Sequence, residues 1–271
     1  MHERTARVAM LRCEDAHAAL REDAVAREEP LEIRLGGAPL AVVMRTPGDD
    51  EDLALGFLVS ERVVRSPADV VSVRHAAQLA APEAEENAIQ VVLAPGVEVD
   101  LDALRRNLYA SASCGICGKA TLENVLREAP PLDDASRFPA ALLYDLPQRL
   151  AGAQPVFAAT GGLHAAALFD ADGGLLVVRA DVGRHNAVDK VIGWALRRGR
   201  FPLSGHLLLV SGRVSYEIAQ KALVARLPLV AAVSAPSSLA VDLAERSGMA
   251  LVGFLRGATL NVYGRSERIL R

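Results

Sequence analysis

The apolar and polar positions in the first half of the chain predict a β-hairpin. Apolar and polar residues alternate along residues 31–35, two glycines follow, and a second apolar run occupies residues 41–44. A period of two on both sides of a glycine turn is typical of two antiparallel strands. We therefore predict that the ordered part of the chain begins with this hairpin.

A helix is predicted to follow the hairpin. Four acidic residues at 49–52 open an apolar segment that runs to Leu58. Acidic residues are favourable in the first turn of a helix, where they meet the positive end of the helix dipole. We attribute these acids to helix capping and solubility rather than to a metal site, because hard cations bind oxygen ligands spaced around a loop.

The middle of the chain is predicted to contain one strand and two short helices. The strand covers residues 88–93, and the helices cover about 101–108 and 120–127. A stretch of small residues at 111–119 lies between the two helices. Residues 129–140 contain three prolines and two aspartates, a composition typical of a linker.

The second half of the chain has a different pattern, in which apolar runs alternate with amphipathic segments. Continuous apolar strands alternating with helices favour a sheet covered on both faces, with parallel strands. We therefore predict an α/β fold for this half. The predicted strands are 156–159, 165–169, 175–178, 207–210, 229–233, 251–254 and 260–263, and the predicted helices are 187–198, 218–223 and 239–246.

These patterns divide the chain into three parts. Residues 1–29 form an N-terminal tail without a strong apolar period, in which we expect at most a short helix. Residues 30–140 form an α+β domain that carries two cysteines in a loop, and residues 141–271 form the α/β domain. A chain of 271 residues that is 51% hydrophobic is large enough to give both domains a core.

Composition excludes several kinds of partner. The formal net charge of −3 argues against bulk electrostatic binding to nucleic acid. No apolar run reaches the roughly 18 residues that a membrane span requires, and no apolar segment of a signal peptide follows the charged start. Three cysteines in a chain with no export signal indicate a reducing compartment and thiols kept for chemistry. We therefore expect a cytoplasmic protein with no nucleic-acid or membrane partner.

Cys114 and Cys117 are the strongest candidates for chemistry. They form a Cys-x-x-Cys motif among serine, alanine and glycine, and Lys119 beside them favours the thiolate form. Disulfide exchange is disfavoured, since a thioredoxin-like motif opens a helix after a strand near the N-terminus. A metal site lacks ligands, because there is no second Cys-x-x-Cys and no His-x-Glu, and we predict no resident metal. A persulfide carrier suits the loop best, although two incidental cysteines in a small-residue loop remain an alternative.

Three small polar turns in the second half are candidates for anion binding. They cover residues 183–186, 211–213 and 234–238. Two of them join the carboxyl end of a strand to the start of a helix, where free N–H groups and the helix dipole favour a phosphate. Arg184 and Arg213 offer further contacts to such a group. Any one turn is explained by helix capping alone, but three turns with two arginines favour a nucleotide-like ligand.

The motifs together resemble the FdhD/NarQ family of formate dehydrogenase accessory sulfurtransferases. The resemblance covers the chain from about residue 31 to the C-terminus, with Ala180 at a position where the family usually carries an acid. The runs that carry it are residues 46–57, 113–119, 160–164, 181–190, 211–213, 232–240 and 253–257.

The resemblance implies a sulfurtransferase that carries sulfur as a cysteine persulfide. Members accept sulfur from a cysteine desulfurase and deliver it to the bis-molybdopterin guanine dinucleotide form of the molybdenum cofactor, which is then inserted into formate dehydrogenase. The implied catalytic residues are Cys114, the usual carrier, and Cys117, which some members also need. A non-catalytic cofactor chaperone and a disulfide oxidoreductase remain alternatives.

The resemblance also implies a fold and a binding site. The second domain is expected to be a three-layer α/β/α domain similar to the cytidine deaminase fold without its zinc residues, and the protein a homodimer. The cofactor is a bound substrate, and its expected contacts come from the anion-binding turns and from one further segment. These residues are Arg184, His185, Asn186, Ser211, Arg213, Ser234, Ser237, Phe254, Leu255, Arg256, Gly257, Ala258 and Thr259.

Overall fold

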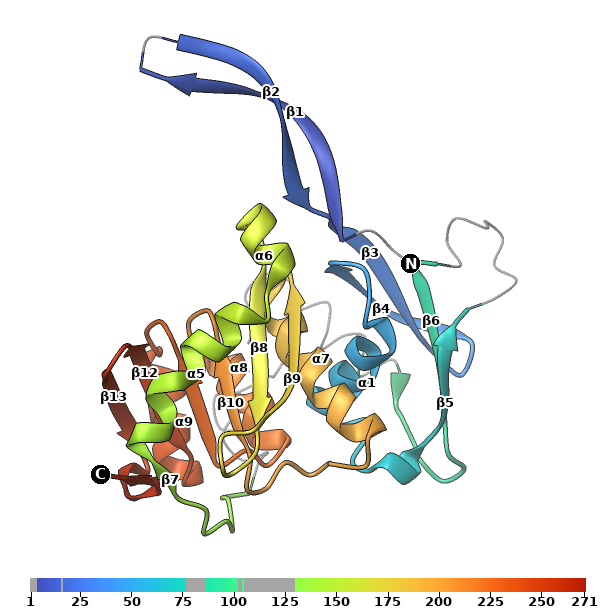
Figure 1. The fold of residues 1–271 in the computed structure, drawn as a ribbon. Helices are drawn as coiled ribbons and strands as arrows, with labels where there is room; N and C mark the ends of the chain where they lie inside the picture. Colours follow the sequence, from blue (N-terminus) through green and yellow to red (C-terminus); the bar gives the residue numbers. More distant parts are fainter. Residues whose placement is uncertain (1–3, 16, 77–85, 102–103, 105–129) are drawn as a thin grey trace.

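A computed structural model describes residues 4–15, 17–76, 86–101, 104 and 130–271 of the chain (Figure 1). Over these residues the protein is a mixed α/β structure. The cysteine motif and the predicted helix at 120–127 lie outside the described residues, as does most of the predicted helix at 101–108.

A small sheet and one helix form the N-terminal body. The predicted hairpin is confirmed, because β3 (Glu29–Leu35) pairs antiparallel with β4 (Ala38–Arg45). The predicted strand at 88–93 is also confirmed as β6 (Ala88–Leu93), which lies parallel to β3 and antiparallel to β5 (Val70–His75). The predicted helix is α1 (Asp50–Ser60), and the turn Pro67–Asp69 precedes β5.

A six-stranded sheet forms the centre of the C-terminal body, with strand order β13-β12-β11-β10-β8-β9. Its three middle strands are parallel, as predicted, whereas the outer strands pair antiparallel with their neighbours. The strands are β8 (His164–Phe169), β9 (Leu175–Asp181), β10 (Leu207–Val210), β11 (Leu229–Ala232), β12 (Ala250–Arg256) and β13 (Thr259–Gly264).

Helices cover both faces of this sheet (Figure 1). Alternate strand residues point to opposite faces. Ala167, Leu209 and Ala231 pack in one cluster with α5 (Ala140–Gly152), and Leu208 and Val230 pack in another with α1 and three further helices. These helices are α7 (Arg184–Arg197), α8 (Tyr216–Val224) and α9 (Ser238–Ser247). Near the C-terminus, β7 (Phe138–Pro139) pairs parallel with β14 (Ile269–Leu270), which follows the turn Ser266–Arg268.

The strand predicted at residues 156–159 is wrong, because this segment belongs to helix α6 (Pro155–Thr160). Pro155 stands at the first helical position, where its fixed φ and missing N–H are tolerated. Gly161 ends the helix with a φ of 63°. The run of apolar residues between them is too short for periodicity to separate a buried strand from a helix.

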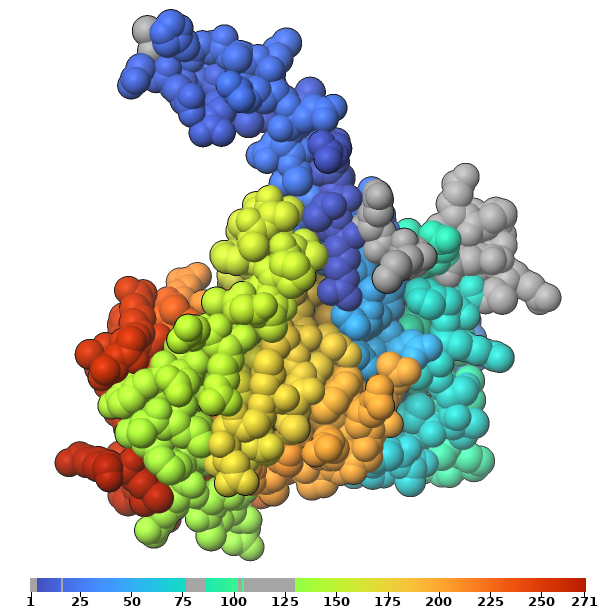
Figure 2. Space-filling model, in the orientation of Figure 1, coloured from blue at the N-terminus to red at the C-terminus, as the bar shows by residue number. Residues whose placement is uncertain are grey.

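The short helix expected within residues 1–29 is also wrong. The segment forms a long antiparallel hairpin of β1 (Thr5–Glu14) and β2 (His17–Ala26), which projects from the body as a narrow arm (Figures 1 and 2). Its many alanines and charges conceal the alternation that normally identifies a strand. Leu11 is 58% exposed and Leu20 is 82% exposed. The division of the chain at residues 29 and 140 stays a prediction.

The acidic residues at the start of α1 do not have the predicted capping and solubility role. Asp49 makes no side-chain cap, and Asp50 and Asp52 are buried. Asp50 accepts hydrogen bonds from Arg45 at 3.1 and 3.0 Å, and Asp52 accepts from Arg179 of β9 at 3.0 and 2.7 Å. Buried charges require such partners. The acids therefore join the small sheet, α1 and the large sheet.

Candidate functional site

The three predicted anion-binding turns lie along one edge of the large sheet. Because β10 and β11 are parallel, the turns at 211–213 and 234–238 follow strand ends at the same edge. β8 runs antiparallel to β10 and β9 runs antiparallel to β8, so His164 and Asp181, which are paired in register, lie at this edge too. Ligands of α/β sheets bind at the carboxyl ends of the strands, and the three turns lie together there as predicted.

Backbone hydrogen bonds join the turns that follow β10 and β11 to each other and to the segment that begins at Phe254. The N–H of Val214 donates to Ala235 at 3.2 Å, and the N–H of Ser237 donates back to Val214 at 2.9 Å. Residues 254–259 are joined to the turn at 234–238, because the N–H of Phe254 donates to the carbonyl of Ser234 at 3.1 Å. We call the surface formed by residues 181–186, 211–215, 234–238 and 254–259 the sheet edge.

Three helices begin at the sheet edge. α7 starts at Arg184, α8 at Tyr216 and α9 at Ser238. The first turn of each helix has backbone N–H groups without partners inside the helix, and each N-terminus carries the positive end of its dipole. Convergence of three such ends favours an anionic ligand.

Several buried polar groups near these helix starts have no hydrogen-bond partner in the described part of the chain. They are Nε of Arg184, Nε2 of His185, Oγ of Ser215 and Nε2 of Gln220. Buried polar atoms are nearly always paired, so a cluster of exceptions indicates a binding site. Sequence reasoning identified the first two residues. It missed Ser215 and Gln220, whose burial depends on how α8 packs and has no signal in the sequence.

The two histidines of this region are held in their neutral form. Burial lowers the pKa of His185, and the positive charges of Lys221 and Arg184 lower it further. The negative charges of Glu217 and Asp189 oppose this shift. Burial also lowers the pKa of His164, with Arg184 adding to the effect. A neutral imidazole has one donor and one acceptor nitrogen. His185 can therefore act as a hydrogen-bond donor or as a hydrogen-bond acceptor toward a ligand at pH 7.

These pKa shifts predict that the protein loses stability in mild acid. The unfolded state binds protons at these histidines below about pH 6.5, whereas the folded state resists protonation. The free energy of unfolding should therefore fall as the pH drops below this value. Urea denaturation between pH 7.5 and 5.0 measures the slope, and His185→Gln should flatten it, with exposed His17→Gln as the control. An unchanged slope in His185→Gln would contradict a neutral His185.

Other residues of the 181–190 motif hold the sheet edge in place. Lys190 is fully buried and donates to Asp181 at 2.7 Å and to the carbonyl of Thr46 at 2.9 Å. The amide nitrogen of Asn186 donates to Asp181 at 2.9 Å and to the carbonyl of Met44 at 2.8 Å. Asn186, predicted as a cofactor contact, thus uses its donors on Asp181 of β9 and on the small sheet.

Two of the predicted serines also have structural partners. Ser237 caps α9, since its Oγ accepts from the N–H of Ala240 at 3.4 Å. Ser211 Oγ accepts from the N–H of Ala165 at 2.9 Å, which fixes the turn to β8. Arg213 is exposed at the same turn. The capping explanation therefore holds for Ser237, and Arg213 is available to a ligand.

The segment predicted from residue 254 to 259 forms the outer end of the sheet edge. Phe254 is 41% exposed and has a φ of 54°, an uncommon conformation for an aromatic residue and one that is frequent at functional sites. The Leu255 side chain is fully buried, so only its backbone faces the edge. Arg256 donates to the carbonyl of Val233 at 3.3 Å. The remaining members are exposed and are Gly257, Ala258 and Thr259.

The described residues contain no group of three or more histidine, cysteine or acidic side chains that could hold a metal ion. Within the same residues, no helix is long and apolar enough to cross a membrane. Cys13 is an exposed free thiol on the projecting hairpin. The predicted catalytic residues Cys114 and Cys117 lie outside the described part of the structure.

The fold and the sheet edge define an α/β protein in which three helix starts and several unpartnered polar atoms lie at the carboxyl ends of parallel strands. A model of the FdhD/NarQ family matches residues 26–270. The chain therefore belongs to the FdhD/NarQ family, which confirms the resemblance seen in its motifs.

Individual proteins agree with this assignment. The chain is 51% identical to a Streptomyces coelicolor protein named Sulfur carrier protein FdhD, over 98% of this chain and 95% of that protein. A Mycolicibacterium paratuberculosis protein of the same name is 54% identical over 93% of this chain and 94% of its own length. A crystal structure of a formate dehydrogenase accessory protein from Desulfotalea psychrophila aligns with a TM-score of 0.80 at 26% identity, covering 99% of this chain and all of that one.

Proposed function

We propose that the protein is a sulfurtransferase that carries sulfur as a persulfide on Cys114. It would deliver this sulfur to the molybdenum cofactor in its bis-molybdopterin guanine dinucleotide form, before the cofactor enters formate dehydrogenase. The observation that carries the proposal is the near-full-length identity of 51% to a relative named Sulfur carrier protein FdhD. The sheet edge supports it, because helix starts and unpartnered donors suit the phosphates of a guanine dinucleotide.

The proposed chemistry balances without an outside oxidant. The Cys114 thiolate attacks the terminal sulfur of a persulfide on a cysteine desulfurase, and the desulfurase cysteine leaves as a thiolate. Release of that sulfur as sulfide requires two electrons. Cys117 can supply them by attacking the Cys114 persulfide, which forms a Cys114–Cys117 disulfide and frees HS⁻. A cellular thiol then reduces the disulfide.

The proposed partners follow from this chemistry. A cysteine desulfurase supplies the sulfur, and formate dehydrogenase receives the cofactor in the cytoplasm. We also propose a homodimer, for which the projecting hairpin offers exposed apolar side chains at Leu11 and Leu20. The net charge of −3 supports the absence of a nucleic-acid partner.

Incubation with a cysteine desulfurase and cysteine tests the carrier role. Intact-mass spectrometry should show an adduct of about 32 Da, one sulfur atom bound to a thiolate. Cys117→Ala should keep the adduct because it retains the attacking thiolate, whereas Cys114→Ala should lose it. An adduct of equal yield on Cys114→Ala would overturn the assignment of the carrier.

A non-catalytic cofactor chaperone is the second candidate function. The sheet edge favours it as much as it favours the first, since binding and presenting the cofactor requires no thiol. This candidate predicts that a double variant lacking both thiols of the motif still activates formate dehydrogenase.

A further inference from the structure

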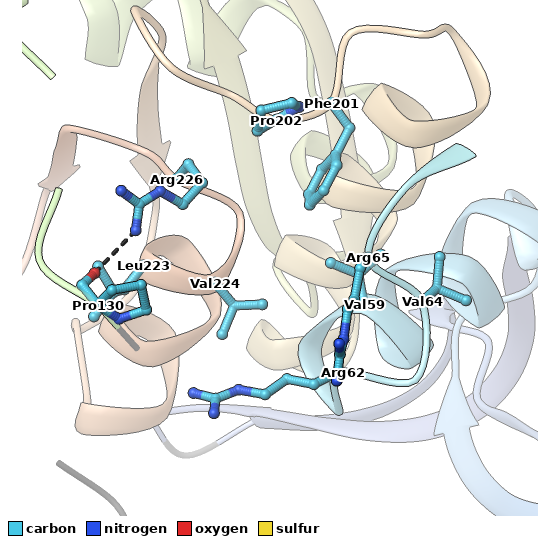
Figure 3. Close-up of a pocket in the computed structure, with 10 residues that line it drawn as sticks. All are labelled: Val59, Arg62, Val64, Arg65, Pro130, Phe201, Pro202, Leu223, Val224 and Arg226. Atoms are coloured by element: carbon cyan, nitrogen blue, oxygen red, sulfur yellow. Dashed lines mark hydrogen bonds between the residues drawn. The ribbon is translucent and has the colours of Figure 1, made fainter. Parts of the chain in front are cut away.

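A pocket lies away from the sheet edge, at the C-terminal ends of three helices (Figure 3). Helix α8 starts at the sheet edge and ends at Val224 in this pocket, so the two sites lie at opposite ends of one helix. The pocket has a volume of about 490 Å³, within the range of small-molecule sites. Its lining residues are Val59, Arg62, Val64, Arg65, Pro130, Phe201, Pro202, Leu223, Val224 and Arg226.

The pocket combines apolar walls with positive charge. Three of its ten described lining residues are arginines, seven are apolar, and none is acidic. Figure 3 shows the Val224 side chain between those of Arg226 and Arg62, with the Phe201 ring to one side of them. A ligand that fills this space would therefore meet an apolar surface with guanidinium groups on both sides.

Arg62 occupies a position that favours glycine. Helix α1 ends in a Schellman motif, in which the N–H of Val63 donates to Leu58 and the N–H of Arg62 donates to Val59, both at 2.9 Å. This motif places Arg62 in the left-handed region, with a φ of 63°. Glycine adopts that conformation without the steric cost that a Cβ brings.

The same arrangement occurs at the end of α8. There the N–H of Leu227 donates to Ala222 and the N–H of Arg226 donates to Leu223, both at 2.9 Å, and Arg226 has a φ of 66°. The third helix at the pocket, α7, ends in the same motif with glycine at Gly199, whose φ is 64°. Two of the three helix ends at this pocket thus carry arginine where glycine would be unstrained.

Helix capping explains only part of this pattern. Guanidinium groups are favourable near the negative C-terminal end of a helix. However, Arg226 donates at 2.9 and 3.0 Å to the carbonyls of Pro130 and Pro131, which belong to a loop and not to α8 (Figure 3 draws the first). These bonds use two of its five N–H donors and fix the guanidinium beside the pocket. Arg65 also lines the pocket; its backbone N–H donates to Asp69 at 2.7 Å, which lowers the pKa of that carboxyl, and its charge adds a smaller effect.

We propose that this pocket binds a small organic anion, in which a carboxylate or phosphate is attached to an apolar or aromatic body. Arg62 and Arg226 bind the anionic group, and the wall formed by Phe201, Pro202 and Val224 contacts the body. Arginine suits both parts of such a ligand, because its planar fork pairs with oxyanions and its faces stack on rings. The site does not depend on the sulfur-carrier function.

Phenyl phosphate is a suitable probe, with inorganic phosphate and phenol as the two halves tested separately. Calorimetric titration should show one phenyl phosphate per chain, with each half binding at least about tenfold more weakly. Arg62→Gly and Arg226→Gly keep the left-handed backbone and remove the guanidinium, so each should weaken phenyl phosphate binding about tenfold or more.

Two further variants locate the probe. Arg246→Gln changes an exposed arginine on α9 and should leave binding unchanged. Arg213→Gln tests whether the phosphate binds at the sheet edge. The proposal is overturned if phenyl phosphate does not bind, if Arg62→Gly and Arg226→Gly bind it as well as the wild type, or if only Arg213→Gln weakens it.

Discussion

Replacement of Gly56 by alanine should destabilise the protein by more than about 3 kcal/mol, because no space exists for a single added carbon. A Cβ at this position would lie 1.8 Å from the carbonyl oxygen of Asp189. On the facing helix, a Cβ at Gly193 would lie 1.8 Å from the carbonyl oxygen of Asp52. Helices α1 and α7 therefore touch backbone to backbone, and either alanine forces them apart.

Urea denaturation of the Gly56→Ala variant measures this effect. Gly152→Ala is the matched control, since it lies in helix α5 and its added Cβ would meet nothing within 4 Å. Alanine there should be neutral or stabilising by up to about 1 kcal/mol. Equal unfolding midpoints for Gly56→Ala and the wild type would show that α1 and α7 do not pack at this distance.

The close helix contact explains why two sequence motifs far apart in the chain belong together. Around the glycines, Asp52 of the first motif pairs with Arg179, and Asp189 of the second accepts from Ser60 at 2.6 Å and from Lys221 at 2.8 Å. The two motifs are also joined directly, because Lys190 of the second motif donates to the carbonyl of Thr46 of the first at 2.9 Å, and together they form one structural unit. This unit positions Arg184 and His185, the members of the second motif with unpartnered nitrogens.

Local patterns predicted most of the fold. The hairpin of β3 and β4 and the alternation of strands and helices after residue 164 depend on periodicity and turn residues that a sequence displays directly. The location of the anion-binding turns was also predictable, because the ends of parallel strands meet at one edge of a sheet.

The errors arose where distant contacts decide the structure. The acids of α1 have the pattern of a solvated helix start, but Asp52 is buried against Arg179 of β9, which is 127 residues away in the chain. The hairpin of β1 and β2 has too few large apolar residues to display its period.

The candidate site, like the fold, was predicted in part. Arg184 and His185 were identified from their turn, but the neutral state of His185 depends on burial and on Lys221 of another helix. Asn186 lies in a turn predicted to contact a ligand, but its amide donates to Asp181 and to the carbonyl of Met44 in the small sheet. Ser215 and Gln220 carry no local signal at all.

The central claim is that Cys114 carries the sulfur that activates formate dehydrogenase. Cys114→Ala should reduce formate dehydrogenase activity to background when it replaces this protein in a strain that lacks it, because Cys114 is the proposed acceptor of the first sulfur. Cys13→Ala is the matched control, since this thiol is exposed on the hairpin, and it should restore full activity.

Formate dehydrogenase activity in such a strain, measured with the enzyme's abundance held equal by immunoblot, is the most direct test. The sulfur-carrier account predicts wild-type activity with the unaltered chain and with Cys13→Ala, and background activity with Cys114→Ala. Full activity with Cys114→Ala would contradict it, and full activity with the double variant Cys114→Ala/Cys117→Ala would leave the cofactor chaperone as the function.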